Sequence, residues 1–204
     1  MVRRVFPTDL LRGMPYERRP SGTGRGPHQL LLVPVGKLPA GVLSWLGSAL
    51  PPILHCVCQI GPALAHPDYA WNARRQQYLA DAVLARVQVG SARCALAVAD
   101  LDLYVPDLNF VFGLADRGQL RAIIALPRLR QSFYGLSEDT DLFRSRVIKE
   151  AVHELGHLFG LEHCNNRRCV MAFSNSLPDT DHKAQYPCEK CNARLAGGEP
   201  DPHR

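Results

Sequence analysis

Three histidines and a glutamate near the C-terminal end have the spacing that metal-assisted hydrolysis needs. The run is His153-Glu154-Leu155-Gly156-His157-Leu158-Phe159-Gly160-Leu161-Glu162-His163. On a helix, His153 and His157 lie on one face, so both imidazoles can reach one cation. Gly160 can adopt a positive φ and end the helix in a turn that brings His163 toward that cation. Three neutral imidazoles and a water form the open tetrahedral arrangement of a catalytic zinc site.

Glu154 stands one residue after the first histidine, about 100° around the helix. From there it cannot easily ligate the same ion, but it can reach a water bound to that ion, as a general base must. The alternative is an ordinary amphipathic helix with surface histidines. In a chain of this composition the His-Glu-x-x-His core arises by chance about once in a hundred sequences, and adding Gly160 and His163 lowers this to roughly a few in a hundred thousand. The spacing therefore favours a metal site.

Four cysteines form a second candidate metal site directly after the histidines. They are Cys164, Cys169, Cys188 and Cys191. Four thiolates at such short spacings fit a closed tetrahedral site, which is typical of structural zinc. Two disulfides are the alternative. The tail that carries these cysteines has few apolar residues, so a metal would supply the free energy of folding that it lacks. We expect two zinc ions per chain, one catalytic and one structural.

The remaining cysteines and the N-terminal sequence indicate a reducing compartment. The chain has seven cysteines, an odd number that disfavours a closed disulfide framework. Cys56, Cys58 and Cys94 lie in apolar runs and are expected to be buried free thiols in strands. No secretory signal is visible at the N-terminus. The apolar stretch 30–54 contains Lys37 and several prolines and glycines, so we reject it as a membrane span. The sequence therefore predicts a cytoplasmic protein.

Length and composition suit one domain with a small appendage. The chain has 204 residues, of which 46% are hydrophobic and 21% charged, and its net charge is +5. These proportions are ordinary for a globular protein and argue against a disordered chain. The excess positive charge is too small and too scattered to indicate a nucleic-acid partner.

The apolar pattern predicts an α/β fold that positions the histidine helix. We expect strands over 30–35, 53–60 and 94–105, helices over 39–50 and 72–89, and a hairpin from 110–112 and 120–126. Ser137 can cap a last long helix that runs to about Phe159. Its expected core-facing residues are Ile148, Val152, Leu155 and Phe159.

Three parts of the chain follow from this pattern. Residues 1–28 are rich in Arg, Pro and Gly and are expected to form an extension. Residues 29–160 form the α/β subdomain with the zinc-binding helix. Residues 161–204 form a small C-terminal subdomain around the structural zinc.

The combined motif resembles the archaemetzincins, which are zinc metallopeptidases of the metzincin clan. The residues that carry the resemblance are His153, Glu154, His157, Gly160, His163, Cys164, Cys169, Met171, Cys188 and Cys191, with the segments 102–106 and 108–113. The resemblance implies a metzincin-like fold with a mixed sheet, two long helices and a small zinc-stabilised C-terminal subdomain. It also implies a catalytic zinc on the three histidines, Glu154 as base, and a second zinc on the four cysteines.

Two further residues take their meaning from this resemblance. Met171 matches the Met-turn, in which a thioether packs beneath the histidines. Some metzincins carry a tyrosine two residues later; this chain has Phe173, so a tyrosyl ligand is excluded there. By the same analogy, the strand near 121–126 would form the upper rim of the cleft and pair with an extended peptide.

The predicted function is zinc-dependent peptide hydrolysis by a zinc-bound water that Glu154 assists. The partner is then a peptide or protein substrate, with neither nucleic acid nor membrane. One alternative is a zinc-stabilised module that binds peptides or proteins with little hydrolysis. Another is a zinc-ribbon nucleic-acid binder, which would leave the histidine motif unexplained. The sequence leaves open endopeptidase or aminopeptidase action, the substrate, and the oligomeric state.

Overall fold

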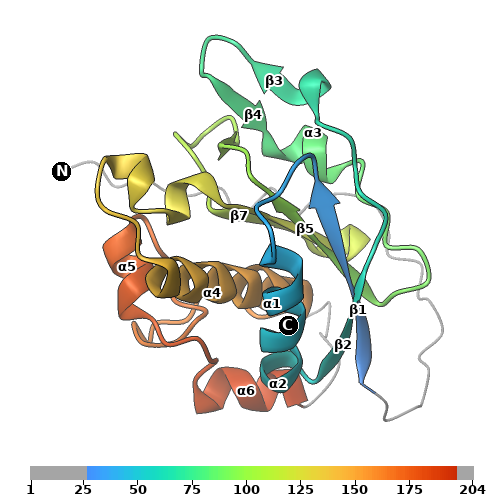
Figure 1. The fold of residues 1–204 in the computed structure, drawn as a ribbon. Coiled ribbons are helices and arrows are strands. Elements are labelled where there is room, and N and C mark those ends of the chain that lie inside the picture. Colours follow the sequence, from blue (N-terminus) through green and yellow to red (C-terminus); the bar gives the residue numbers. More distant parts are fainter. Residues whose placement is uncertain (1–26, 197–204) are drawn as a thin grey trace.

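The computed structural model describes residues 27–196, which contain both strands and helices and end in three helices (Figure 1). The strands are β1 (His28–Val35), β2 (Cys56–Ile60), β3 (Trp71–Asn72), β4 (Gln77–Leu79), β5 (Cys94–Ala99), β6 (Leu103–Tyr104), β7 (Gly113–Asp116) and β8 (Arg121–Ala125). The helices are α1 (Val42–Ala49), α2 (Pro51–Leu54), α3 (Ala80–Leu84), α4 (Thr140–Leu158), α5 (Leu177–His182) and α6 (Glu189–Ala196). The predicted extension 1–28 lies outside the described residues except for its last two positions, and β1 already begins at His28.

A five-stranded mixed sheet is the framework of the fold. Its strand order is β2-β1-β5-β8-β7. All neighbouring pairs are parallel except β7 and β8, which run antiparallel and place β7 at one edge. A second, three-stranded sheet has the order β3-β4-β6. The mixed α/β fold is therefore as predicted.

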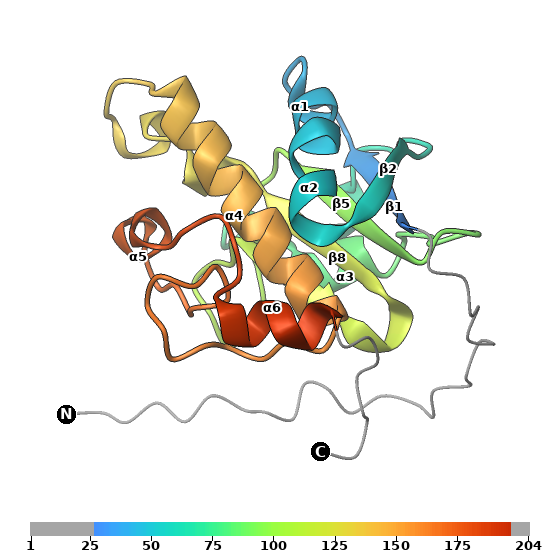
Figure 2. The same cartoon turned by 90° about the horizontal axis from the view of Figure 1, so that it is seen from below.

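The large sheet buries both faces, and β5 shows how the chain divides between them. Cys94, Leu96 and Val98 belong to the core beneath α1, α2 and α4, while the alanines between them pack toward α3. Small side chains on the second face let α3 approach closely. Figure 2 shows α4 crossing the sheet on the same side as α1 and α2. The histidine motif is thus carried by a helix laid on the sheet, next to the β7 edge.

Helix α4 begins two residues later than the sequence suggested. The carboxylate of Asp139, not the hydroxyl of Ser137, caps it by accepting from the N–H of Leu142 at 2.9 Å. An aspartate at this position also interacts favourably with the positive end of the helix dipole. Val152 and Leu155 are buried as expected, whereas Ile148 and Phe159 are only partly buried.

The long helix predicted over 72–89 is wrong, and a hairpin followed by one short helix stands in its place. The side chain of Asn72 accepts from the N–H groups of Arg74 and Arg75, which closes a turn before helical bonds can form. Gln76 then has φ 55°, outside the right-handed helical region. Only Ala80–Leu84 is helical, so among the described residues α4 is the one long helix.

Strand boundaries also differ from the prediction. Ile53 and Leu54 belong to α2, because Pro51 begins a new helical turn instead of ending the helix, and β2 starts at Cys56. The apolar run 94–105 divides at a bend between β5 and β6, where Asp100 and Asp102 pair with Arg130 and Arg128. The hairpin is real, but its first strand is Gly113–Asp116 and not 110–112.

The C-terminal segment is docked onto α4 by buried charges as well as by cysteines. Arg146 makes two bonds of 2.7 Å to the carboxylate of Asp181. The ammonium of Lys149 donates to the carbonyls of Thr180 and Asp181, each at 3.1 Å. These contacts hold α5 against α4, so the tail has means of attachment that its sparse apolar content did not suggest.

Cys56, Cys58 and Cys94 were expected to be buried free thiols in strands, and two of the three are buried. All seven cysteines are free thiols, with Cys56 and Cys94 buried and Cys58 half-buried in the strands of the large sheet. Within residues 27–196, no helix is both long and apolar enough to cross a membrane.

Candidate active site

The three histidines of the motif come together at the C-terminal end of α4. His153 and His157 lie one turn apart with ring centroids 4.6 Å from each other. Gly160 has φ 86°, and its N–H and that of Leu161 donate back to His157 and Gly156. This is the six-residue turn that commonly ends helices at a glycine. It carries His163 back to 5.3 Å and 4.9 Å from the other two rings.

Backbone carbonyls fix the orientation of both helical imidazoles. Nδ1 of His153 is 2.9 Å from the carbonyl of Val170, and Nδ1 of His157 is 2.8 Å from that of Leu161. A carbonyl can only accept, so in each neutral ring Nδ1 carries the proton and Nε2 carries a lone pair. This tautomer is the one that ligates a metal through Nε2.

The two Nε2 atoms then face each other at 3.1 Å with no proton between them. Two lone pairs in that position repel unless a cation lies between them. For zinc with tetrahedral angles and Zn–N distances of about 2.0–2.1 Å, two ligand nitrogens lie about 3.3 Å apart. One ligand atom from each of the three histidines lies within 4.8 Å of the others. The donor set fits a zinc ion.

Burial keeps the imidazoles in the neutral form that ligates metals. It lowers the pKa of His153 well below its ordinary value, and the positive charge of Lys183 lowers it further. His163 is exposed at the surface, but desolvation by the surrounding protein atoms still lowers its pKa to about 4, with smaller contributions from His157 and Lys183. Near neutral pH the cluster is therefore ready to bind a cation without first losing protons.

Glu154 is buried directly under the edge strand. A Cβ built on Gly113 would lie 2.5 Å from Cγ of Glu154 and 2.7 Å from its Oε1. The backbone of β7 can therefore cover the carboxylate only because residue 113 has no side chain. Burial, then the nearby charge of Glu150, raises the pKa of Glu154 to about 8. A dication beside the carboxylate would act in the opposite direction.

Met171 lies beneath the histidine helix, where the Met-turn was expected. It is fully buried, and a Cβ on Gly156 would lie 2.4 Å from its sulfur, so the missing side chain of Gly156 makes room for the thioether. The carbonyl of Met171 accepts from the N–H of Cys164 at 2.9 Å. Phe173 follows at the surface and contacts the ring of His163 with centroids 4.9 Å apart.

The four C-terminal cysteines form the second cluster, as the sequence suggested. One sulfur from each lies within 4.8 Å of the others. The sulfurs of Cys164 and Cys188 are 3.8 Å apart, which is the separation that tetrahedral zinc with Zn–S of about 2.3 Å requires. The cluster contains no disulfide. Its donor set also fits a zinc ion.

The N-terminal end of helix α6 favours the thiolate form of the cysteine that precedes the helix. Cys188 directly precedes α6, and the backbone N–H of Cys191 lowers the pKa of the Cys188 thiol to about 7. Helix N-termini stabilise negative charge in general. The N–H of Cys188 in turn donates to the sulfur of Cys169 at 3.2 Å. Backbone donors thus already neutralise part of the charge that four thiolates would bring together.

The edge strand beside the histidine helix is β7, and not the strand near 121–126 that was expected at the rim of the cleft. Residues 121–125 form β8, which is paired with β5 on one side and β7 on the other. Its backbone groups are therefore already bonded. The free edge belongs to β7, whose first residue covers Glu154.

Sequence reasoning missed three residues of this region. Gly113 belongs to the segment 108–113, which carries the family resemblance but no spacing signal for this residue. Its contact with Glu154 explains why a glycine stands there. Glu150 and Lys183 form a buried ion pair behind the histidines. A glutamate and a lysine so far apart in the sequence carry no pairing signal, so the structure was needed to find them.

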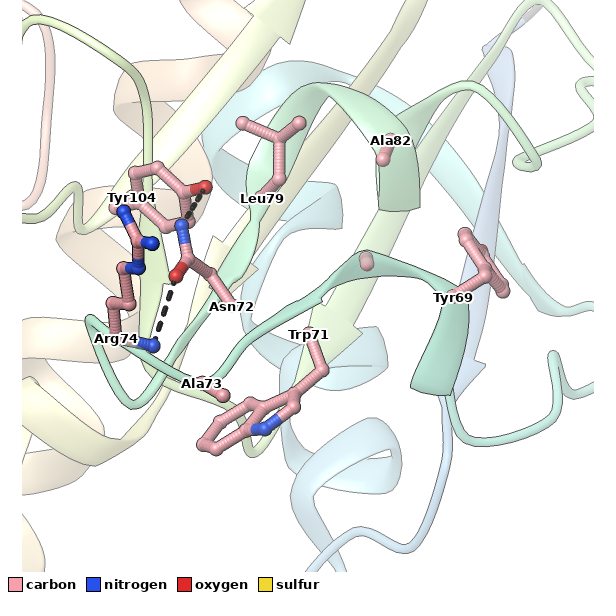
Figure 3. A pocket seen from close by; sticks show the side chains of 9 residues that line it. Tyr69, Trp71, Asn72, Ala73, Arg74, Leu79, Ala82 and Tyr104 are labelled. Atoms are coloured by element: carbon pink, nitrogen blue, oxygen red, sulfur yellow. Dashed lines mark hydrogen bonds between the residues drawn. The ribbon is translucent and has the colours of Figure 1, made fainter.

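A surface cavity lies on another part of the molecule. It measures about 340 Å³ and is lined by residues of the small sheet, such as Trp71 and Tyr104, and of the segments next to it, such as Tyr69 and Arg74 (Figure 3). The amide of Asn72 donates to the hydroxyl of Tyr104 at 2.9 Å there. None of the histidines or C-terminal cysteines lines it, so the chemistry is not located in this cavity.

Comparisons with known proteins place the chain in a family. The pattern of peptidase family M54 matches residues 68–197. The archaemetzincin of Pyrococcus abyssi is 42% identical over 175 residues, which cover 81% of this chain and 93% of that protein. The archaemetzincin of Methanocaldococcus jannaschii is 40% identical, covering 82% and 92%.

Two solved structures have the same fold. The archaemetzincin of Archaeoglobus fulgidus, in complex with malonate, superposes with a TM-score of 0.72 at 35% identity and covers 81% of this chain and 99% of its own. A zinc-dependent peptidase of Methanocorpusculum labreanum superposes with a TM-score of 0.73 at 30% identity, with the same coverage.

Substitution of Gly113 tests whether the edge strand positions the glutamate. Gly113→Ala should displace the Glu154 carboxylate and lower kcat for peptide hydrolysis at least about tenfold, because small displacements of a reacting group are costly. Gly47→Ala on α1 is the matched control, since a Cβ there meets only ordinary contacts of 3.8 Å. Both variants should fold, as judged by circular dichroism. A Gly113→Ala protein with the parent kcat would show that this contact does not matter.

Proposed function

Because this chain belongs to peptidase family M54, the archaemetzincins, we propose that its histidine cluster is the catalytic zinc site of the enzyme. The chain is a zinc metallopeptidase, and peptides are its substrates. We assign the zinc to His153, His157 and His163. One observation carries this assignment: two Nε2 lone pairs face each other at 3.1 Å while both Nδ1 protons are bound to carbonyls.

Glu154 is assigned the proton transfer. When bound, zinc would supply a Lewis acid that acidifies water and polarises the peptide carbonyl. The carboxylate of Glu154 takes the proton of the attacking water at one oxygen and delivers it to the nitrogen of the leaving amine. Burial suits this role, because a carboxylate with a raised pKa holds a proton more readily than an exposed one.

The free edge of β7 is assigned to the substrate. Antiparallel bonds alternate along a strand, and the carbonyl of Phe112 accepts from the N–H of Ala125 at 2.8 Å. The N–H and carbonyl groups of Gly113 and Ala115 therefore point away from β8. An extended peptide can add to this edge by main-chain bonds, which brings it past Glu154.

We assign a second zinc to Cys164, Cys169, Cys188 and Cys191, which makes two zinc ions per chain. The support is the sulfur geometry and the backbone donors around it. Four thiolates and no open position make a structural site, not a catalytic one. Reduced thiols are needed to hold this metal, so we also propose that the protein works in the reducing cytoplasm.

Glu154→Gln should separate metal binding from turnover. The amide keeps the size of the side chain but cannot take a proton, so kcat should fall about 10²- to 10⁴-fold while both metals remain. The measurement is hydrolysis of a mixed peptide library beside zinc counting on the same samples. Activity equal to that of the parent would remove Glu154 from the mechanism.

Stepwise chelation should remove the histidine metal before the cysteine metal. The first site has neutral ligands and an open position, whereas the second has four anionic ligands and none. After the first loss, α4 should stay folded on its buried core residues. After the second, residues 164–169 and α6 should become protease-sensitive, while α5 stays attached through Arg146 and Lys149.

Metal counting and mapped limited proteolysis at each chelator concentration test this order. Fully loaded protein should contain two zinc ions. Early loss of the cysteine metal with an active histidine site would reverse the assigned roles. A reproducible content of one zinc in metal excess would remove one of the two sites.

Ala115→Pro tests the substrate edge. Proline removes one outward N–H without touching the ladder to β8, so KM for peptides should rise about fivefold, the value of one hydrogen bond near 1 kcal/mol. The matched control is Ile60→Pro at the opposite edge of the sheet. There the N–H of Gly61 donates inward to Leu32, so that of Ile60 points outward. Equal KM in the two variants would dissociate β7 from substrate binding.

A further inference from the structure

An ion pair lies buried directly behind the histidine cluster. Glu150 on α4 and Lys183, just after α5, have side chains only 4% and 1% exposed, and Nζ lies 3.3 Å from Oε1. The hydroxyl of Thr180 donates to the same oxygen at 3.2 Å. Burying two charges is costly, and a buried pair contributes little net stability compared with apolar packing. Net stability alone therefore does not explain why an ion pair is buried in this position.

A second contact of Lys183 indicates what the ion pair does. Its ammonium also donates to the carbonyl of Ala172 at 3.3 Å, so it reaches the turn that contains Met171. Three consecutive carbonyls of this turn have separate partners. That of Val170 lies at Nδ1 of His153, that of Met171 accepts from the N–H of Cys164, and that of Ala172 accepts from Lys183. The turn is thus pinned at the histidine, at the cysteine cluster and at the ion pair.

We propose that Lys183 is a positioning residue for the catalytic zinc. Lys183 is held by Glu150 and fixes the turn that contains Met171, so that the carbonyl of Val170 stays in place to orient His153. This inference rests on the proposed histidine zinc site. The chain of contact runs from α4 through Glu150 and Lys183 to the turn and back to His153 on α4. A helix and the carbonyl that orients its histidine are thereby held in register. Groups that orient metal ligands in this way commonly change metal affinity about 10- to 100-fold when removed.

The neighbouring lysine separates this role from simple docking of the C-terminal segment. Lys149 is also buried on α4 and also donates to that segment, but to the carbonyls of Thr180 and Asp181. Neither of these carbonyls belongs to the turn that contains Met171. If both lysines served only to attach the segment, their loss would have the same effect on the histidine site. If Lys183 positions the turn, only its loss will weaken the hold on the metal.

The experiment compares Lys183→Met with Lys149→Met in the full chain loaded with zinc. Methionine keeps the length of the side chain and removes the charge and the donors. Zinc release to a chromogenic chelator is followed in time, beside kcat and KM. Lys183→Met should release the faster-leaving zinc at least about tenfold sooner and lower kcat with little change in KM. Lys149→Met should match the parent in both, although it should melt at a lower temperature.

A double variant removes the complication of an unpaired buried carboxylate. Glu150→Gln/Lys183→Met has no uncompensated charge and should recover thermal stability while its zinc still leaves early. Glu150→Gln alone should stay near the parent release rate, because the amide oxygen can accept from both Lys183 and Thr180. Recovery of stability without recovery of metal binding is the result that a purely structural role would not give.

Three results would overturn the inference. One is parent-like zinc release in Lys183→Met. Another is equal acceleration in Lys149→Met. The third is failure of both Lys183 variants to fold, which would assign the ion pair to the fold as a whole. Failure of the proposed function would be seen earlier and separately, as a parent protein that holds no zinc in its faster-releasing site or hydrolyses no peptide.

Discussion

The structure depends on one requirement: two imidazoles on consecutive turns of a helix must present lone pairs, not protons, to the same point. Helix spacing alone puts the rings close together but leaves their tautomers undecided. The carbonyls of Val170 and Leu161 decide them by occupying both Nδ1 positions. Leu161 belongs to the turn that ends the helix, and Val170 comes from a segment that returns beneath it. Both must therefore be held accurately, and most of the C-terminal third of the chain does this.

The histidine cluster and the cysteine cluster are therefore structurally linked. His163 and Cys164 are adjacent in sequence and turn toward different clusters. The N–H of Cys164 donates to the carbonyl of Met171, whose side chain fills the space left by Gly156. Above the same helix, Gly113 lets the edge strand close over Glu154. Each of these contacts is a place where a missing side chain or a backbone group, and not a ligand, sets the geometry.

The candidate metal ligands could be predicted from the sequence more completely than the helices and strands could. Ligand spacing is local: His153, His157 and the turn at Gly160 follow from helical geometry, and the cysteines from their short separations. The predicted helix over 72–89 is wrong because the side chain of Asn72 closes a turn, which apolar spacing cannot reveal. Ser137 and Asp139 are both residue types that cap helices well, so residue type alone does not determine which of them begins α4. Gly113 and Lys183 act through space on residues far along the chain, so no spacing could have indicated them.

The position of these residues along the chain has a consequence for synthesis. The large sheet, including β7, is complete by residue 125, whereas every histidine and cysteine of the two clusters lies between residues 153 and 191. Chains emerge from the ribosome N-terminus first, and domains tend to fold in that order. The strands of the sheet are therefore synthesised before α4, which covers one of its faces, and before either cluster. The ligands of both proposed metal sites are therefore among the last parts of the described chain to be synthesised.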